Sequence, residues 1–201
     1  MLLITIDVVL DRLLIRDVLK AILSSIFFHR LFGSIRPLSP PREVLEIAYP
    51  SVDDPALDAL VDEKLSHLMA ALDTSSHSFA NQPHSESTQH QRRAQLVVSF
   101  FEKKTRKAWF SKSEEEVCWE EWTINVSSIT PRNETEKIRV AKSAESQLQM
   151  IIMKIIDIVN DNKDHIPPIA TTEANPFPYQ ISIPSETGDT WGSVFKKILV
   201  E

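Results

Sequence analysis

The sequence has very few glycines and cysteines, the residues on which many phosphate-binding, disulfide and thiol sites depend. Its 201 residues include three glycines and one cysteine, Cys118. Phosphate-binding loops need glycine so that the backbone can approach the phosphates, and neither GxGxxG nor GxxxxGK[ST] occurs. The GxSxG motif of serine hydrolases is also absent. Because a single cysteine excludes an intrachain disulfide framework, we expect a reducing, intracellular setting.

The chain also lacks an excess of positive charge and a long hydrophobic run. Lysine and arginine total 22 against 28 acidic residues, which gives a net charge of −6. Non-specific nucleic-acid binding needs a cationic surface that displaces counterions, so we expect no nucleic-acid partner. The apolar residues 1–10 lack a basic leader and are interrupted by Asp7. Residues 21–28 are far shorter than the roughly 20 residues that span a bilayer. We therefore expect a cytoplasmic protein.

The length and apolar content suffice for one globular domain. Hydrophobic residues make up 42% of the chain, and a typical domain has about 100–200 residues. Residues 73–93 differ from the rest, because Ser, His, Gln and Asn dominate and aliphatic residues are almost missing. Such a segment cannot bury enough apolar area to offset its ordering entropy. We predict a single domain over residues 1–201 with a disordered internal loop at 73–93.

Hydrophobic periodicity predicts alternating strands and helices. The predicted strands are residues 3–10, 44–49, 96–101, 119–127 and 179–183, and the predicted helices are residues 13–31, 55–72, 131–162 and 191–199. Strands 96–101 and 119–127, joined by a polar loop, form a long hairpin. Short, hairpin-linked strands favour an α+β fold with a mixed or antiparallel sheet.

The predicted helices differ in how much of their surface is apolar. Helix 13–31 is apolar on nearly all sides, which is typical of a central core element. Asp53 or Asp54 is expected to cap the next helix, with Pro55 in its first turn. In helix 131–162 the predicted core-facing stripe consists of Ile138, Ala141, Leu148, Ile152, Ile155 and Val159.

No group of residues predicts catalysis, metal binding or a cofactor. Half of the six histidines lie within 73–93, at spacings that fit a metal site poorly. Glutamates surround Cys118 and would raise its pKa, so we interpret this thiol as a small apolar group in a strand. The acidic residues 114–116, Glu120 and Glu121 are interpreted as a solvated run rather than an acid–base pair. We therefore expect no enzyme activity.

The most informative feature is an aromatic pair at the expected tip of the hairpin. Trp109 and Phe110 lie between Lys107 and Lys112, in the least apolar part of the hairpin. Burial of each ring would stabilise the fold by very roughly 1.5–3 kcal/mol, and this stabilisation is lost if both rings stay in water. Either the loop folds back and buries the pair in the core, or the pair is an exposed anchor for a partner, because aromatic residues dominate binding hot spots.

The basic residues 103–107 allow an alternative, a peripheral membrane-binding module that uses this stretch and the inserted aromatic pair. However, the acidic run begins seven residues after Lys107. It would partly cancel the positive field within a Debye length of about 8–10 Å. We therefore expect membrane association to be indirect.

Residues 95–126, QLVVSFFEKKTRKAWFSKSEEEVCWEEWTINV, resemble the autophagy-related protein 101 family. The similarity lies in the strand, the basic run, the Trp/Phe tip and a second strand that opens with Trp119 and Trp122. The helix end Phe28-His29-Arg30, the end of helix 131–162 and the strand around residues 178–182 are similar as well.

The resemblance implies a HORMA domain, with three helices on a largely antiparallel sheet and no known catalysis. It implies a scaffold at the phagophore assembly site that belongs to the autophagy-initiation kinase complex. Such a scaffold forms a heterodimer with the HORMA domain of autophagy-related protein 13, stabilises it, and recruits downstream autophagy factors.

The family's exposed WF finger matches Trp109 and Phe110, which the resemblance makes the partner-binding residues. Animal members have a proline between the two aromatic residues, whereas here they are adjacent. Neighbouring residues on an extended backbone point to opposite sides. Both rings therefore enter one pocket only if the tip is kinked.

Overall fold

The computed structural model describes residues 1–33, 35–74, 92–108, 111–169 and 175–184, with the backbone alone for 105–108 and 111–114. Along the chain the elements are β1 (Leu2–Asp11), α1 (Ile15–Arg30), β2 (Arg42–Val44), β3 (Ile47–Tyr49), α2 (Pro55–Thr74), β4 (Arg92–Ala108), β5 (Ser111–Ile129), α3 (Glu134–Asp161) and β6 (Tyr179–Ser182). This is the predicted α+β class. The helix predicted at 191–199 lies outside the described residues.

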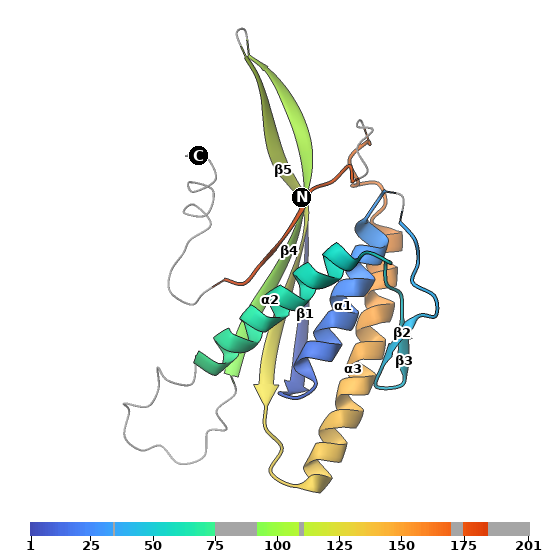
Figure 1. The fold of residues 1–201 in the computed structure, drawn as a ribbon, viewed down its shortest axis with the longest axis vertical. Coiled ribbons are helices and arrows are strands. Elements are labelled where there is room, and N and C mark those ends of the chain that lie inside the picture. Colours follow the sequence, from blue (N-terminus) through green and yellow to red (C-terminus); the bar gives the residue numbers. More distant parts are fainter. Residues whose placement is uncertain (34, 75–91, 109–110, 170–174, 185–201) are drawn as a thin grey trace.

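The main sheet is mixed and has the strand order β1-β5-β4-β6. β1 runs parallel to β5, whereas β4 is antiparallel to both β5 and β6. On β5, Trp122, Ile124 and Val126 are buried and the residues between them are half-buried, which confirms the predicted alternation. The helices cover one side of this sheet (Figure 1).

α1 is the central helix, as its apolar surface predicts. It contacts both α2 and α3, and nearly every residue from Val18 to Phe27 is buried (Figure 1). The cap of α2 is also as expected, because Asp54 Oδ1 accepts from the backbone N–H groups of Ala56 and Leu57 at 3.0 and 3.1 Å.

α3 packs beside β1 and covers part of its open edge. Gln147 accepts from the Val9 N–H and donates to the Val9 carbonyl, at 3.1 and 3.2 Å. Lys154 donates to the Thr5 carbonyl at 3.3 Å. Backbone groups at a sheet edge are open to pairing with other chains. These side chains therefore satisfy part of an edge that has no neighbouring strand among the described residues.

The buried stripe of α3 differs from the prediction. Leu148, Ile152 and Ile155 are buried as expected, but Ile138 is 63% exposed. At 3.6 residues per turn, Ile138 lies about 80° around the helix from Leu148, on the side away from Ala144. The remaining core-facing positions are Val140, Ala144 and Ile151. The predicted stripe was therefore placed too far to one side at its N-terminal end.

Residues 44–49 comprise the end of β2, a turn at Leu45 and Glu46, and β3, so the prediction of one strand there is wrong. β2 and β3 pair antiparallel, with Val44 opposite Ile47. Leu45 and Glu46 have φ values of 51° and 61°. Tight hairpins with two positive φ values usually contain Asn or Gly. The Leu-Glu pair carries no such turn signal, which is why periodicity alone predicted a continuous strand.

β4 and β5 form a ladder much longer than predicted. Pairing runs from Arg92 opposite Ser128 to Ala108 opposite Ser111, with one register shift between Phe100 and Phe101. The polar loop predicted between the strands is therefore wrong, because most of its residues are strand. Lys103 lies opposite Glu116 and Lys104 opposite Glu115, and such cross-strand pairs of opposite charge favour strand pairing. The ladder extends well beyond the helices (Figure 1).

The predicted loop 73–93 is described only at its ends. Asp73 and Thr74 belong to α2, and Arg92 and Arg93 belong to β4. Residues 75–91 lie outside the described residues. None of the helices in the described part of the chain combines the length and apolarity that crossing a membrane requires.

Candidate functional site

Trp109 and Phe110, the predicted partner-binding residues, lie outside the described residues. The ladder pairs Ala108 with Ser111, the residues on either side of them. We call residues 102–108 and 111–117 the projecting ribbon, because this part of β4 and β5 continues past the helices (Figure 1). The ribbon therefore leads directly to the aromatic pair in the sequence.

A β-bulge marks the base of the projecting ribbon. Phe100 lies opposite Glu120, but Phe101 lies opposite Cys118, so Trp119 is the extra residue on β5. A bulge bends a strand and increases its twist. Trp119 is 5% exposed and its neighbour Glu120 is fully buried, so two successive residues are buried where a regular strand would alternate.

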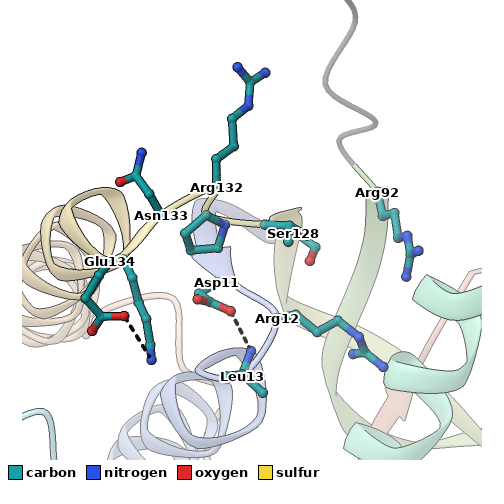
Figure 2. A pocket seen from close by; sticks show the side chains of 11 residues that line it. Asp11, Arg12, Leu13, Arg92, Ser128, Arg132, Asn133 and Glu134 are labelled. Carbon is teal, nitrogen blue, oxygen red and sulfur yellow. Dashed lines mark hydrogen bonds and ion pairs between the residues drawn. The ribbon is translucent and has the colours of Figure 1, made fainter.

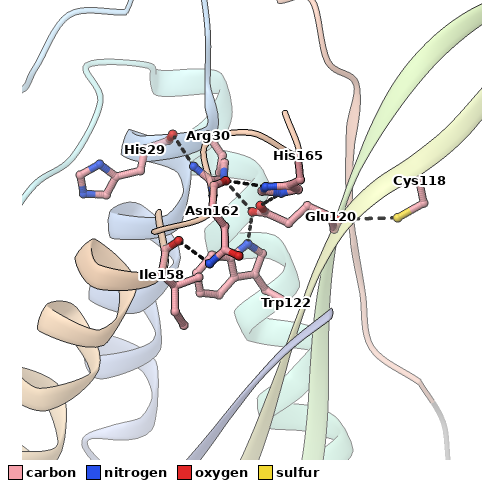
Figure 3. Close-up of polar contacts among 8 residues, drawn as sticks. All are labelled: His29, Arg30, Cys118, Glu120, Trp122, Ile158, Asn162 and His165. Carbon is pink, nitrogen blue, oxygen red and sulfur yellow. Dashed lines mark hydrogen bonds and ion pairs between the residues drawn. The ribbon is translucent and has the colours of Figure 1, made fainter. Parts of the chain in front are cut away.

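Glu120 is the centre of a buried polar cluster. Arg30 Nε donates to Glu120 Oε1 at 2.7 Å, and Trp122 Nε1 donates to the same oxygen. His165 Nε2 lies 2.7 Å from Glu120 Oε2 (Figure 3). Arg30 is 1% exposed. We call Arg30, Glu120, Trp122 and His165 the Glu120 cluster.

The Glu120 cluster corrects the interpretation of Glu120 as part of a solvated run. The bulge and the partners from α1 and from the segment after α3 make burial of its charge possible, because buried charges need ion pairs and hydrogen bonds. One feature of the sequence could have indicated a buried acidic partner. Arg30 ends a helix that is apolar on nearly all sides, and a buried arginine needs a counterion.

His165 connects this cluster to the segment after α3. Its Nδ1 contacts the carbonyl oxygen of Asn162, while its Nε2 faces Glu120. The imidazole also packs on the indole of Trp119, with ring centroids 5.3 Å apart. A hydrogen bond between Nε2 and a carboxyl oxygen needs a proton on one of the two atoms. His165 therefore links α3, β5 and the bulge.

The structure bears on two of the candidate sites considered in the sequence, a metal site among the described residues and the Cys118 thiol. The described residues contain no group of three or more His, Cys, Asp or Glu side chains that could hold a metal ion. Burial, followed by the charge of Glu121, raises the pKa of the Cys118 thiol. A raised pKa disfavours the thiolate nucleophile. This agrees with the interpretation of Cys118 as an ordinary strand residue, although burial has a larger effect than the neighbouring glutamates.

The lowered pKa of His29 predicts that the folded protein loses stability in acid. Burial, and then the nearby charge of Arg30, lower the pKa of His29 from its ordinary value of 6.5. The unfolded chain therefore binds a proton at this residue more readily than the folded chain. The free energy of unfolding should fall as the pH drops below about 6.5. Urea denaturation over a pH series measures this fall.

The variant His29→Leu should flatten the decline below about pH 6.5, because it removes the group that gains a proton on unfolding. His67→Leu is the matched control, since His67 is exposed on α2. If both variants keep the decline of the original chain, another group causes the acid sensitivity.

A pocket of about 550 Å³ lies where the ends of β1 and β5 meet the start of α3 (Figure 2). Its basic lining residues are Arg12, Arg92, Arg132 and Lys137. Arg12 and Arg92 both pair with Asp73, at 2.6 and 3.3 Å. Figure 2 shows the Arg132 side chain extending away from the other lining residues. Arg12 and Arg92 are thus paired with Asp73 within the fold. The basic side chains of the pocket do not point toward one common anion-binding position.

The described architecture defines an α+β domain with three helices on a four-stranded sheet, consistent with a HORMA-like fold. A family model for autophagy-related protein 101 matches residues 7–173. The chain belongs to the autophagy-related protein 101 family, as the resemblance in its sequence predicted, and its role is therefore related to autophagy.

Two relatives support this assignment. The chain is 31% identical over 205 residues to autophagy-related protein 101 of Arabidopsis thaliana, covering 92% of this chain and 88% of the relative. It is 26% identical over 188 residues to autophagy-related protein 101 of Schizosaccharomyces pombe, again with 92% and 88% covered. The similarity therefore extends over most of both relatives.

Proposed function

We propose that this chain is a non-catalytic scaffold of the autophagy-initiation kinase complex that acts in the cytoplasm at the phagophore assembly site. It pairs with the HORMA domain of autophagy-related protein 13, stabilises it, and recruits downstream autophagy factors through Trp109 and Phe110. Family membership and the HORMA-like architecture support this role. The observation that carries the recruitment step is the ladder between β4 and β5, which continues to the residues that flank the aromatic pair.

The length of the projecting ribbon favours an exposed anchor over a buried one. Seven residues of strand, from Glu102 to Ala108, extend about 20 Å at about 3.3 Å per residue. While Ala108 stays paired with Ser111, the end of the ribbon remains far from the core of the domain. Trp109 and Phe110 are then available to a partner, and the aromatic surface that they leave in water is recovered on docking.

The membrane-binding alternative has less support. The ladder places Lys103 opposite Glu116 and Lys104 opposite Glu115, and Lys104 Nζ lies 3.1 Å from Glu102 Oε2. Attraction to anionic lipids depends on an uncompensated cluster of basic residues. Here the basic residues at the base of the ribbon have acidic neighbours on both strands, which weakens the positive field there.

The test is the double variant Trp109→Ala/Phe110→Ala, co-expressed with the HORMA domain of autophagy-related protein 13. We expect an unchanged melting temperature and unchanged co-purification, because both residues follow the last described pair of the ladder, Ala108 and Ser111, in the sequence. Binding of downstream factors should weaken at least about tenfold, as expected for two hot-spot residues. Pull-down with a titrated complex measures this. Lys104→Gln/Glu115→Gln is the matched control on the ribbon and should keep recruitment.

Three outcomes would contradict the proposed recruitment step. If the Trp109/Phe110 double variant unfolds or loses pairing to a comparable degree, the aromatic residues stabilise the fold instead. If the chain alone sediments with anionic vesicles at low salt, and the double variant does not, the aromatic pair acts at a membrane. Unchanged recruitment by the folded double variant would also reject it.

A further inference from the structure

The loop between β5 and α3 contains a threonine followed by a proline, Thr130-Pro131, and both residues line the pocket between β1, β5 and α3. The chain has one other Ser/Thr-Pro dipeptide, Ser39-Pro40. Proline-directed protein kinases phosphorylate a serine or threonine that precedes a proline. We propose that Thr130 is a phosphorylation site of such a kinase. Its phosphate group is bound by three basic residues of the pocket, Arg12, Arg132 and Lys137.

Thr130 is accessible, and its hydroxyl group is available for modification. It is exposed and follows the last pair of the ladder between β1 and β5, in which Asp11 lies opposite Ile129. The hydroxyl group has no hydrogen-bond partner among the described residues. The residue before a proline favours an extended backbone, the form in which protein kinases bind the residue that they modify. A phosphoryl group can therefore replace the hydroxyl proton without breaking a side-chain hydrogen bond of the folded domain.

The transfer uses a protein kinase as catalyst and ATP with Mg²⁺ as phosphoryl donor. Thr130 Oγ1 attacks the γ-phosphorus of ATP, the bond between this phosphorus and the leaving oxygen of ADP breaks, and the hydroxyl proton passes to the catalytic base of the kinase. The product carries a charge of about −1.5 to −2 at pH 7 and three acceptor oxygens. β5 begins in the projecting ribbon at Ser111 and ends at Ile129, so this charge appears at the end of the strand away from the ribbon.

The charge and the size of the pocket favour a phosphate at this position. Four basic and two acidic residues line it, which gives the lining a net charge of +2. Its volume of about 550 Å³ leaves room for a phosphoryl group. The ladder ends with Asp11 opposite Ile129, so Arg12 and Thr130 are the next residues along their strands. Because neighbouring strands lie about 4.7–4.9 Å apart, the Arg12 side chain is long enough to reach a phosphate on Thr130.

Arg12 can turn toward a phosphate because its acidic partner is shared with a second arginine. Arg12 Nη2 lies 2.6 Å from Asp73 Oδ2, and Arg92 Nη1 lies 3.3 Å from Asp73 Oδ1. The Arg12 and Arg92 side chains are 28% and 39% exposed, so both reach solvent. A phosphate of nearly two negative charges attracts a guanidinium more strongly than one shared carboxylate does. When Arg12 binds the phosphate, Arg92 still balances the charge of Asp73.

Arg132 and Lys137 supply two further positive charges. Arg132 is exposed, and its guanidinium makes no ion pair with the described residues. Lys137 Nζ lies 3.9 Å from Glu134 Oε2, and both of these side chains are exposed. An exposed pair of this kind adds little to stability. Both basic side chains can therefore turn toward a phosphate on Thr130 without breaking a buried contact. The phosphate brings together basic groups that point in different directions in the unmodified chain (Figure 2).

Phosphorylation is tested on the folded chain with ATP, Mg²⁺ and proline-directed kinases of the cyclin-dependent and mitogen-activated classes. Peptide mapping by mass spectrometry should locate a phosphate on Thr130. This phosphate should be lost in Pro131→Ala, which keeps the hydroxyl group but removes the residue that the kinase requires. It should be kept in Ser39→Ala, the matched control at the other Ser/Thr-Pro dipeptide. If neither class of kinase modifies Thr130 in the folded chain, whether or not it modifies a synthetic peptide of residues 126–136, the proposed site is wrong.

Binding of the phosphate by the pocket is measured by phosphorus NMR of the phosphorylated Ser39→Ala chain. The second pKa of phosphothreonine is ordinarily about 6, and nearby positive charges favour the dianion. This pKa should therefore be lower in the folded chain than in the phosphorylated peptide of residues 126–136. Arg12→Gln and Arg132→Gln should each raise it toward its value in the peptide. Arg139→Gln, at an exposed position of α3 outside the pocket, is the matched control and should leave it unchanged.

The melting temperature gives a second measure of phosphate binding. It should rise by about 2–4 °C on phosphorylation, because charge-assisted hydrogen bonds then join the loop after β5 to the start of α1. Arg12→Gln should remove most of this rise. Equal pKa values in the folded chain and the peptide, or an unchanged melting temperature, would show that the pocket does not bind the phosphate. These measurements involve no recruited factor, so they do not depend on whether Trp109 and Phe110 bind one.

Discussion

Replacing Glu120 with alanine should lower the free energy of unfolding by about 3–5 kcal/mol, because it leaves a buried positive charge without its counterion. Arg30 is 1% exposed, and its Nε lies 2.7 Å from Glu120 Oε1. The substitution also removes the acceptor of the Trp122 indole and the partner of His165. Equilibrium urea denaturation, followed by tryptophan fluorescence and by far-UV circular dichroism, measures the loss.

A double variant that removes both charges separates the effect of the charge from that of the packing. Arg30→Met/Glu120→Leu should cost less than Glu120→Ala alone, because no uncompensated charge remains in the core. Glu145→Ala, at an exposed position of α3, should stay within about 0.5 kcal/mol of the original chain. If Glu120→Ala matches Glu145→Ala, the carboxylate does not hold the arginine in solution. That outcome would remove the basis of the cluster.

Replacing Leu148 with alanine should lower the free energy of unfolding by about 2–5 kcal/mol, because the cavity adds to the lost transfer energy. Leu148 is fully buried in the middle of α3, where the helix packs on β1 and α1. Ile138→Ala should change stability by about 0.5 kcal/mol or less, because Ile138 is 63% exposed. Thermal and urea denaturation of the two variants give the comparison.

This pair of variants tests the orientation of α3 directly. The sequence places both residues on one predicted stripe, whereas the structure buries one and exposes the other. Both substitutions shorten an aliphatic side chain to alanine in the same helix. A large loss for Ile138→Ala, comparable with that for Leu148→Ala, would mean that the first turns of α3 pack with the predicted face inward.

Hydrophobic periodicity predicted the structure correctly where a segment matched the pattern of only one kind of secondary structure. α1 is apolar on almost all sides and is central, and β5 alternates over Trp122, Ile124 and Val126 as predicted. Periodicity failed where the backbone conformation is not reflected in the order of polar and apolar side chains. Leu45 and Glu46 form a turn without Asn or Gly. The polar residues of the ribbon are held by strand pairing rather than by burial, so their pattern resembles a loop.

Local sequence patterns could not predict the Glu120 cluster, for a different reason. Its members come from positions 30, 120, 122 and 165, and Arg30 and Glu120 are 90 residues apart in the sequence. Glu120 continues the buried alternation of Trp122, Ile124 and Val126, but the polarity of adjacent glutamates favoured the interpretation as a solvated run. The importance of Trp109 and Phe110 rests on residue type, position and family resemblance. It stays a prediction that the double variant tests.

The parallel pairing of β1 with β5 affects how the chain folds during translation. Leu2 lies opposite Glu120, so a ribosome that adds about 5–20 residues per second makes the two partners about 6–24 s apart. During this interval α1, which is apolar on nearly all sides, emerges without the strand and the helices that cover it. The apolar surface of α1 therefore stays partly uncovered until α3, the last of its helical neighbours along the chain, has been made.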